Sequence, residues 1–368
     1  MNETLKVALV HDWLVSKGGA ENVLFDLHCL FPNAPIYTLV YDKASAPEWT
    51  LSCDIRTTYI QKIPYGKKLY KKMLSLMPKA WESLDLTEYD LIISSSSSCA
   101  KGVITSPNSV HICYCHTPTR YIWDMYYSYL EASSFVKKCA MKMLVPKLRL
   151  WDYVAAQRVD YFIANSRYIA NRIKKFYRRD SKVIYPGCYI NDYDLTPNTG
   201  DYYLIVSRLV YYKRIDLAVK ACNKLKKKLI IVGAGEEYKK LKAIAGPTIE
   251  FKGFMSDDEI RKLYLNAKAF IFPGEEDFGI TPIEAQSAGI PVLAFGRGGA
   301  LETVKDMETG LFFDEQSEES LSDCILRFEA DGVSYNKEQI RENSLNFSRN
   351  VFSTKILEFI NSVLGSKK

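Results

Sequence analysis

The sequence predicts an α/β protein of two doubly wound domains, each with a parallel sheet that helices cover on both faces. Three observations carry this prediction. Short apolar runs alternate along the chain with longer stretches of helical periodicity. Turn-forming residues gather between positions 187 and 201, and the alternation restarts after them. The length of 368 residues also exceeds the roughly 150 residues of a usual single domain.

Apolar runs in the first half predict the strands of the first sheet. They cover residues 6–11, 34–39, 91–95, 110–115 and 161–164. A loop at residues 16–20 follows the first strand, and a helix is expected from residue 21 to about residue 30. The serine-rich stretch that begins at the end of the third run is interpreted as a loop.

The second half repeats this arrangement. Strands are predicted at residues 203–207, 228–232, 249–252, 269–273 and 292–295, with a helix around 215–226 after the first of them. We therefore expect an N-terminal domain over residues 1–187 and a C-terminal domain over residues 188–350. A last helix, within residues 351–368, is expected to pack back on the N-terminal domain.

The composition is that of an ordinary globular protein, with 47% hydrophobic and 25% charged residues. The sequence contains no run of about 18 apolar residues, so no membrane span is predicted. The opening residues, MNETLKVALVHDW, read as a first strand and not as a signal peptide. Nine cysteines without a CxxC pair, together with four histidines, favour reduced thiols over a zinc site. We expect a cytoplasmic protein that needs no metal and no other cofactor.

Charge is uneven along the chain. From Arg56 to Trp81 there are seven basic residues and no acidic one, interleaved with apolar residues, and the stretch from Phe135 to Trp151 has a similar mixture. This pattern suits an anionic membrane surface, such as the inner face of the plasma membrane. It equally suits two solvated helices with ordinary buried faces, and both interpretations stay open. Nucleic acid is disfavoured as a partner, because no nucleic-acid-binding signature accompanies the charge.

The segment from residue 272 to residue 304 carries the most informative motif. It leaves a buried strand and enters a helix near Thr281 and Pro282, and proline fits a first helical turn. Such a helix start presents N–H groups and a positive dipole end to a diphosphate. Glu276 precedes this helix and Glu284 lies about one turn inside it, so that the first could reach a sugar and the second a ribose.

Basic residues and glycines mark the ends of other strands. Arg208 and Lys213 follow a strand, where they could offset the negative charge of a departing diphosphate. Gly18 and Gly19 join the first strand to its helix without the full GxGxxG pattern, which argues against a dinucleotide cofactor. His116 also stands at a strand's carboxyl end, where open α/β sheets bind ligands.

The motifs EDFGI at residues 276–280, EA at 284–285 and AGIPV at 288–292 together resemble the signature of glycosyltransferase family 4. Asp277 departs from the pattern, since a glycine is commoner there. The resemblance implies the GT-B fold, in which two Rossmann-like domains face a central cleft, and a reaction that retains anomeric configuration. It also implies that a sugar nucleotide binds to the C-terminal domain and the acceptor to the N-terminal domain.

The resemblance also assigns roles to individual residues. It implies that Arg208 and Lys213 bind the diphosphate and stabilise it as it leaves, and that His116 and Glu276 contact the transferred sugar. Arg120, Trp123 and Asp124 are expected on the acceptor side. The residues expected at the donor are Gly18, Gly19, Gly233, Phe254, Phe278, Gly279, Ile280, Thr281 and Glu284.

The segments YCHTPTRYIWD and SSSSSCAKG resemble those of bacterial family members that build surface polysaccharide, such as lipopolysaccharide, several of them mannosyltransferases. This implies transfer of a hexose, with mannose from GDP-mannose as the first choice, to a lipid-linked or oligosaccharide acceptor. Two alternatives remain. One is a catalytically silent, membrane-associated partner of a polysaccharide-assembly complex, and the other is a sugar-nucleotide epimerase.

Overall fold

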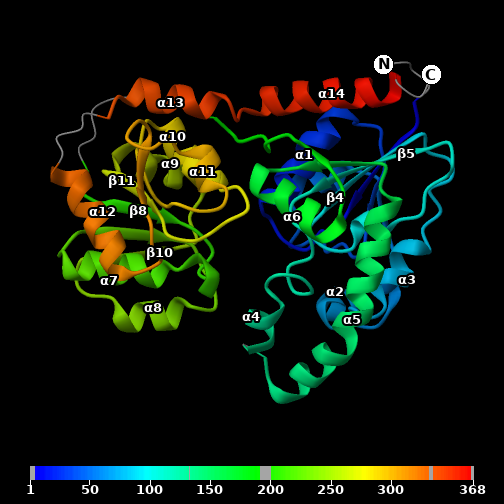
Figure 1. The fold of residues 1–368 in the computed structure, drawn as a ribbon, viewed down its shortest axis with the longest axis horizontal. Coiled ribbons are helices and arrows are strands. Elements are labelled where there is room, and N and C mark those ends of the chain that lie inside the picture. Colours follow the sequence, from blue (N-terminus) through cyan, green and yellow to red (C-terminus); the bar gives the residue numbers. More distant parts are fainter. Residues whose placement is uncertain (1–4, 132, 191–199, 331–334, 366–368) are drawn as a thin grey trace. The chain divides into compact units, whose positions relative to one another are not determined.

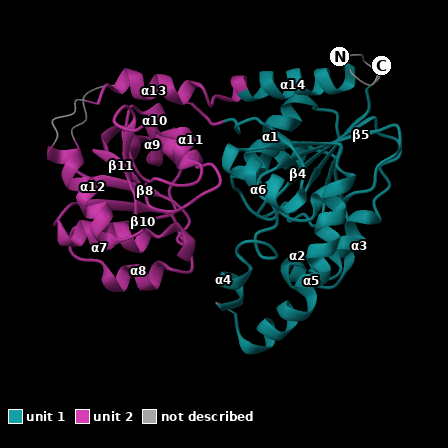
Figure 2. Ribbon diagram, in the orientation of Figure 1, with its two compact units in different colours: residues 1–187, 352–368 teal, residues 188–351 magenta. Residues whose placement is uncertain are grey.

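A computed structural model describes residues 5–131, 133–190, 200–330 and 335–365. The chain forms two compact units (Figure 2). Unit 1 consists of residues 1–187 and 352–368, and unit 2 consists of residues 188–351. Each unit has one parallel sheet between layers of helices, which confirms the predicted fold class (Figure 1).

Unit 1 contains a seven-stranded sheet in the order β3-β2-β1-β4-β5-β6-β7. The order reverses between β1 and β4, and open sheets bind ligands at the carboxyl ends of the strands beside such a reversal. The strands are β1 (Val7–His11), β2 (Ile36–Thr38), β3 (Ile55–Thr57), β4 (Leu91–Ser96), β5 (Val110–Cys115), β6 (Tyr161–Ala164) and β7 (Ser181–Val183).

Helices cover both faces of this sheet because alternate residues of each strand point to opposite sides. Val7 and Leu9 of β1 belong to a core shared with α1 (Gly19–Leu30) and α14 (Arg349–Gly365). Ala8 and Val10 pack on the other side with α3 (Met77–Glu82) and η4 (Ala100–Gly102). The remaining helices are η1 (Glu48–Ser52), η2 (Tyr59–Lys62), α2 (Gly66–Leu69), η3 (Tyr70–Lys72), α4 (Tyr126–Glu131), α5 (Phe135–Arg158) and α6 (Arg167–Tyr177).

Unit 2 contains a six-stranded sheet in the order β10-β9-β8-β11-β12-β13, with its reversal between β8 and β11. Its strands are β8 (Tyr203–Val206), β9 (Leu229–Val232), β10 (Ile249–Gly253), β11 (Ala269–Phe272), β12 (Val292–Phe295) and β13 (Gly310–Phe313). Its helices are η5 (Tyr211–Lys213), α7 (Ile215–Lys224), α8 (Tyr238–Ile244), α9 (Asp257–Asn266), α10 (Ile280–Ser287), α11 (Ala300–Thr303), α12 (Glu318–Ala330) and α13 (Lys337–Leu345).

All ten strands predicted from the sequence are present, with ends that shift by at most a few residues. Three strands were not predicted, namely β3, β7 and β13. Part of the turn-rich segment between positions 187 and 201, residues 191–199, lies outside the described residues. The basic stretch from Arg56 to Trp81 is not one solvated helix but five short elements, β3, η2, α2, η3 and α3. In the part of the chain that the structure describes, no helix has the length and apolar character to cross a membrane.

Candidate functional site

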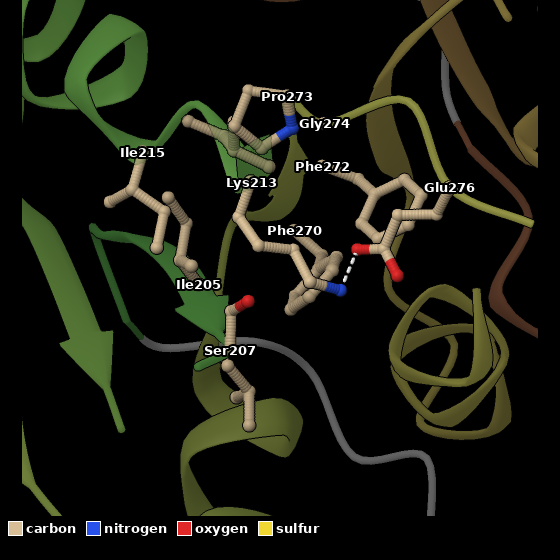
Figure 3. Close-up of a pocket in the computed structure, with 11 residues that line it drawn as sticks. Ile205, Ser207, Lys213, Ile215, Phe270, Phe272, Pro273, Gly274 and Glu276 are labelled. Atoms are coloured by element: carbon tan, nitrogen blue, oxygen red, sulfur yellow. Dashed lines mark ion pairs between the residues drawn. The ribbon is translucent and has the colours of Figure 1, made fainter. Parts of the chain in front are cut away.

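The carboxyl ends of β8 and β11 bring two predicted residues into contact. Lys213 ends η5, which follows β8, and its Nζ forms an ion pair with the carboxylate of Glu276, which follows β11 (Figure 3). The two side chains are only 16% and 18% exposed. They line a small pocket with Ser207 and Gly274. A partly buried cation and a carboxylate therefore share one place at the sheet reversal, where a charged ligand could compete for either of them.

Two glycines hold the Glu276 loop in place. The backbone N–H of Gly299 donates to the carbonyl of Glu276 at 2.8 Å. Gly298 has φ +64°, and a Cβ there would lie 2.4 Å from the same carbonyl oxygen. A larger residue at either position would displace the loop. This close packing explains why the glycine pair follows β12 in the sequence.

Helix α10 begins beside this loop. Its first flanking residue, Gly279, has φ +94°, which favours glycine. No side chain among the described residues caps the helix start, and Ile280 and Thr281 of the first turn are half-buried. Phe278 anchors the preceding residues through ring contact with Phe347 at 5.8 Å between centroids. The first-turn N–H groups of α10 therefore offer a seat for an anion.

Glu284 lies one turn inside α10. The pKa of its carboxyl is raised, because burial raises it more than the hydrogen bond from the Tyr264 hydroxyl lowers it. Tyr264 lies in α9 and donates to Oε2 of Glu284 at 3.2 Å. Nothing in the sequence singles out Tyr264, because its contact with α10 arises from packing between helices. Its hydroxyl holds the carboxylate that is expected to bind a ribose.

The other predicted residues of unit 2 lie at the same edge of the sheet but apart from this ion pair. Arg208 is exposed, and its Nη2 donates to the Tyr212 hydroxyl at 3.2 Å. Gly233 has φ +128°, and its N–H donates to the Gly253 carbonyl at 2.7 Å. Phe254 follows β10 with 90% of its surface exposed. The structure thus brings Lys213 and Glu276 together, whereas Arg208, Gly233 and Phe254 stand on neighbouring loops.

In unit 1, His116 follows β5 and belongs to a chain of polar side chains. Its Nε2 lies 2.8 Å from Oγ of Ser95, and the same hydroxyl lies 3.1 Å from Nδ1 of His11. Nε2 of His11 lies 4.0 Å from Oε1 of Glu21, in the first turn of α1. The sheet register produces this arrangement, because His11 of β1 pairs with Ser95 of β4.

Gly18 and Gly19 form the start of α1 and are both exposed. Gly18 has extended backbone, and no described side chain caps the helix start. A Cβ on Gly18 would lie 2.9 Å from Oε2 of Glu21, so the glycine leaves room for that carboxylate. The loop and His116 therefore lie at the same edge of the sheet and are linked through Glu21, His11 and Ser95.

The residues expected on the acceptor side are held by contacts within unit 1. The indole Nε1 of Trp123 donates to Asp152 at 2.7 Å, and Asp124 forms an ion pair with Arg172 at 2.6 Å. Arg120, between these anchors and His116, is half-buried. Trp123 and Asp124 thus fix the shape of the loop that presents Arg120.

Asp152 is the centre of a buried polar network. Besides Trp123 it accepts hydrogen bonds from Lys101, Thr119 and Tyr177, at 2.5, 2.9 and 2.8 Å. Burial opposes the charge on Lys101, but the Asp152 carboxylate outweighs it and holds the pKa of Lys101 well above its ordinary value. Nothing in the sequence beyond the residue types indicates this network, because its members are spread from residue 98 to residue 177.

A metal site finds no support among the residues that the structure describes, where no group of three or more His, Cys, Asp or Glu side chains could hold an ion.

Comparison with known proteins identifies the class to which this fold and these sites belong. A family model described as "Glycosyl transferases group 1" matches residues 194–346, and one described as "Glycosyltransferase Family 4" matches residues 17–191. Together they match most of both units. The chain belongs to this family of glycosyltransferases, with two Rossmann-like domains of the GT-B type.

The relatives of this chain include mannosyltransferases. The chain is 26% identical to the alpha-1,3/1,6-mannosyltransferase ALG2 of Kluyveromyces lactis over 370 residues, which cover 82% of this chain and 71% of that protein. It is 32% identical over 138 residues to the GDP-mannose-dependent alpha-(1-6)-phosphatidylinositol monomannoside mannosyltransferase of Mycobacterium tuberculosis. That match covers 33% of this chain and 36% of the mycobacterial protein.

A solved structure confirms the architecture. The sucrose-phosphate synthase of Thermosynechococcus elongatus superimposes with a TM-score of 0.75 at 18% identity. The superposition covers 98% of this chain and 100% of the synthase chain. At this identity the likeness establishes the fold and leaves the reaction to the residues of the site.

Proposed function

We propose that the protein is a retaining hexosyltransferase that moves mannose from GDP-mannose to a lipid-linked or oligosaccharide acceptor in surface polysaccharide synthesis. The observation that carries the proposal is the partly buried Lys213–Glu276 pair beside the uncapped start of α10. A cation and a helix start at one sheet edge suit a diphosphate, and a carboxylate beside them suits a sugar hydroxyl. The two mannosyltransferase relatives support the choice of sugar.

The donor would bind with its diphosphate against the start of α10 and its ribose hydroxyls on Glu284. Lys213 would then turn from Glu276 to the diphosphate, because a doubly charged anion attracts the ammonium more strongly than one carboxylate does. Arg208, whose exposed side chain donates to the Tyr212 hydroxyl, would turn to join it. Glu276 would be released to accept hydrogen bonds from the sugar, and His116 of unit 1 would contact the same sugar.

The chemical step would break the bond between the sugar's anomeric carbon and the diphosphate oxygen, with the electron pair leaving on that oxygen. The acceptor oxygen would form its bond on the same face, and its proton would pass to the departing diphosphate. The products are a glycoside of retained configuration and a nucleoside diphosphate. Lys213, Arg208 and the start of α10 would stabilise the negative charge that grows on the leaving group.

The test is a panel of sugar nucleotides, headed by GDP-mannose, studied by calorimetry and by release of nucleoside diphosphate. We expect selective binding of one donor and loss of that binding in Glu284→Ala. A matched control is Glu342→Ala, a change of the same type in α13 of the same unit. Failure to bind any donor or nucleoside diphosphate would reject the transferase and favour the silent partner. Interconversion of two sugar nucleotides without acceptor would favour the epimerase.

We further propose that unit 1 carries the enzyme to an anionic membrane surface. Leu74, from the first basic stretch, packs with Val145 and Leu148 of α5, so the two stretches lie together. Large apolar side chains nevertheless remain exposed there, including Tyr65 at 75%, Phe135 at 80% and Val136 at 78%. Exposed lysines lie in the same two stretches, at residues 67, 68, 71, 72, 137, 142 and 147. Apolar insertion and attraction to anionic lipid would act at one surface.

Flotation with anionic liposomes tests this surface. Binding at low salt should weaken in Lys71→Glu/Lys72→Glu and in Phe135→Ser/Val136→Ser. The control is Lys175→Glu/Lys182→Glu, which makes the same charge change at exposed lysines of unit 1 elsewhere. Absence of binding by the wild-type protein would refute the proposal, as would equal loss in the control.

A further inference from the structure

The hydroxyl of Ser95 lies between two imidazole rings at the carboxyl edge of the unit 1 sheet. It is within hydrogen-bond distance of Nδ1 of His11, at 3.1 Å, and of Nε2 of His116, at 2.8 Å. Ser95 is fully buried and His11 is 2% exposed. The sheet predicts this meeting, because odd-numbered residues of β1 and β4 face the same side and His11 and Ser95 are in register.

A serine hydroxyl has one proton, so it can donate to only one of these nitrogens and must accept from the other. An uncharged histidine likewise carries a proton on only one ring nitrogen. The proton position on His11 therefore decides the direction of the Ser95 hydroxyl. The direction of the hydroxyl in turn decides which nitrogen of His116 carries a proton.

Glu21 determines which ring nitrogen of His11 carries the proton. Its carboxylate lies 4.0 Å from Nε2 of His11, and its side chain is itself only 8% exposed. A carboxylate can only accept a hydrogen, so it favours the proton of His11 on Nε2. Nδ1 of an uncharged His11 then accepts from Ser95, and the Ser95 oxygen accepts from Nε2–H of His116. Nδ1 of His116 is left as the hydrogen-bond acceptor of that ring.

We propose that Ser95 and His11 are positioning residues that fix the tautomer of His116, with its proton on Nε2. The significance for catalysis rests on the proposed function, since His116 would then accept a hydrogen bond from a hydroxyl of the transferred sugar. Neither Ser95 nor His11 touches the sugar in this scheme. They act through His116, from its buried side.

The other charged and titratable groups around the chain are held in different contacts. Asp12, next to His11, accepts from the backbone N–H groups of Ser97, Ser98 and Ala100 at 2.6, 2.9 and 2.8 Å. Tyr70 is buried, and burial, together with the negative charges of Glu21 and Asp12, raises the pKa of its hydroxyl to about 12. Tyr70 therefore stays protonated at neutral pH. The ring of Tyr114 packs edge-on against His116 at 5.3 Å.

The experiment is a long-range proton–nitrogen NMR spectrum of the histidine side chains in the protein without substrate. The chain has four histidines, so each ring can be assigned by replacing one at a time. We expect His116 of the wild type to show one protonated nitrogen, Nε2, and one unprotonated nitrogen, Nδ1. Ser95→Ala should convert this pattern to an average of both tautomers, and Ser95→Thr, which keeps a hydroxyl, should restore it.

Ser94 provides a matched control on the same strand. Its hydroxyl lies 2.8 Å from Nε2 of His111, on the opposite face of the sheet. Ser94→Ala should alter the signals of His111 and leave those of His116 unchanged. If Ser95→Ala does not fold, His11→Gln serves in its place and should also release the tautomer of His116.

A protonated Nδ1 on His116 in the wild type would overturn the proposal, and so would an unchanged pattern in folded Ser95→Ala or His11→Gln. Failure of Ser95→Thr to restore the pattern would assign the effect to packing and overturn it as well. Because the spectra are recorded without substrate, they test the tautomer of His116 even if the protein turns over no sugar nucleotide. If one is, Ser95→Ala should lower kcat about tenfold, the size of one hydrogen bond, and Ser95→Thr should recover it.

Discussion

At the scale of single residues, the main feature of unit 2 is that its candidate cation already has a partner. Lys213 is paired with Glu276 in a site where both side chains are largely shielded from water. Breaking such a pair by removing one member leaves the other charge without compensation. The pair therefore holds both side chains in place until a ligand replaces one of the two contacts.

Replacing Lys213 with methionine should lower nucleoside-diphosphate release by about 100-fold or more, because the charge that stabilises the leaving group is removed. Turnover by Lys239→Met, which changes an exposed lysine of the same unit, should stay near the wild-type rate. Steady-state release with the donor identified by the panel measures both. Near-normal turnover by Lys213→Met would remove this lysine from the mechanism.

His111 gives unit 1 a defined response to pH. It is fully buried in β5, and burial lowers its pKa to about 4 from the ordinary 6.5. Between these values the unfolded chain binds more protons than the folded one, so stability falls as the pH falls through this window. Below about pH 4 both states are charged, and the loss levels off.

The loss attributable to His111 should reach about 2 kcal/mol at pH 5 relative to pH 7.5. Urea unfolding of the wild type and of His111→Gln at both pH values measures it as the difference between their pH dependences. His28→Gln, at a half-exposed histidine, should keep most of the wild-type dependence. Equal pH dependence of the wild type and His111→Gln would contradict this account.

At the scale of elements, the junction of α5 with η4 organises the loop that follows β5. Asp152 of α5 binds Lys101 of η4 together with Thr119 and Trp123 of that loop. A buried charge satisfied by several donors permits little movement. The loop carrying His116 and Arg120 is thus fastened to the body of the unit on its far side.

Asp152→Ala should destabilise unit 1 by about 3–5 kcal/mol, because it strands the buried charge of Lys101. Lys101→Met/Asp152→Leu should recover a large part of this loss by removing both charges. Asp180→Ala, at an acid whose side chain is 91% exposed, should change stability by less than about 1 kcal/mol. Denaturant unfolding distinguishes these outcomes, and a double variant no better than Asp152→Ala would argue against a charge effect.

The strands that the sequence did not predict share one physical property. β3 and β7 are the two edges of the first sheet, and β13 is an edge of the second. β3 and β7 are short and partly exposed, so no buried apolar run marks these two, whereas β13 (GLFF) is largely buried. Their strand character comes from pairing with a neighbour. Interior strands such as β4 and β12 are buried throughout, so a continuous buried run marks them in the sequence.

The candidate site likewise follows only in part from the sequence. Lys213, Glu276 and Glu284 stand at strand ends and a helix start, which the sequence reveals, but their contacts depend on the order of strands in the sheet. The sequence does not single out His11 and Ser95, because each looks like an ordinary strand residue. The signal that could have found them is a polar residue at the carboxyl end of each of two adjacent strands.

At the scale of the whole molecule, unit 1 is built from two distant parts of the chain. Phe352, Ile356, Ile360 and Val363 of α14 recur at helical spacing and lie in the same core as β1 and α1. The chain thus makes most of unit 1, then all of unit 2, and returns to complete the first core. The last helix therefore completes the core of unit 1, although it lies far from the rest of that unit in the sequence.

Phe352→Ala should destabilise unit 1 by about 3–5 kcal/mol through the cavity that it leaves. Hydrogen exchange measured by peptide mass spectrometry should show faster exchange in β1 and β4 and little change in β8 and β11. Leu326→Ala, at a residue of α12 that is 49% exposed, should leave both sheets protected. Faster exchange spread equally over the two units would contradict the assignment of α14 to the first core.

The return of α14 also determines when this protein can finish folding in the cell. A ribosome releases residues 1–187 long before residues 352–363, so the nascent first unit must wait with its apolar face open while the second unit is translated. Unit 2 has no such delay. A premature stop codon within unit 2 would therefore damage the unit that had already been synthesised, and chaperones or proteases would meet it with that face exposed.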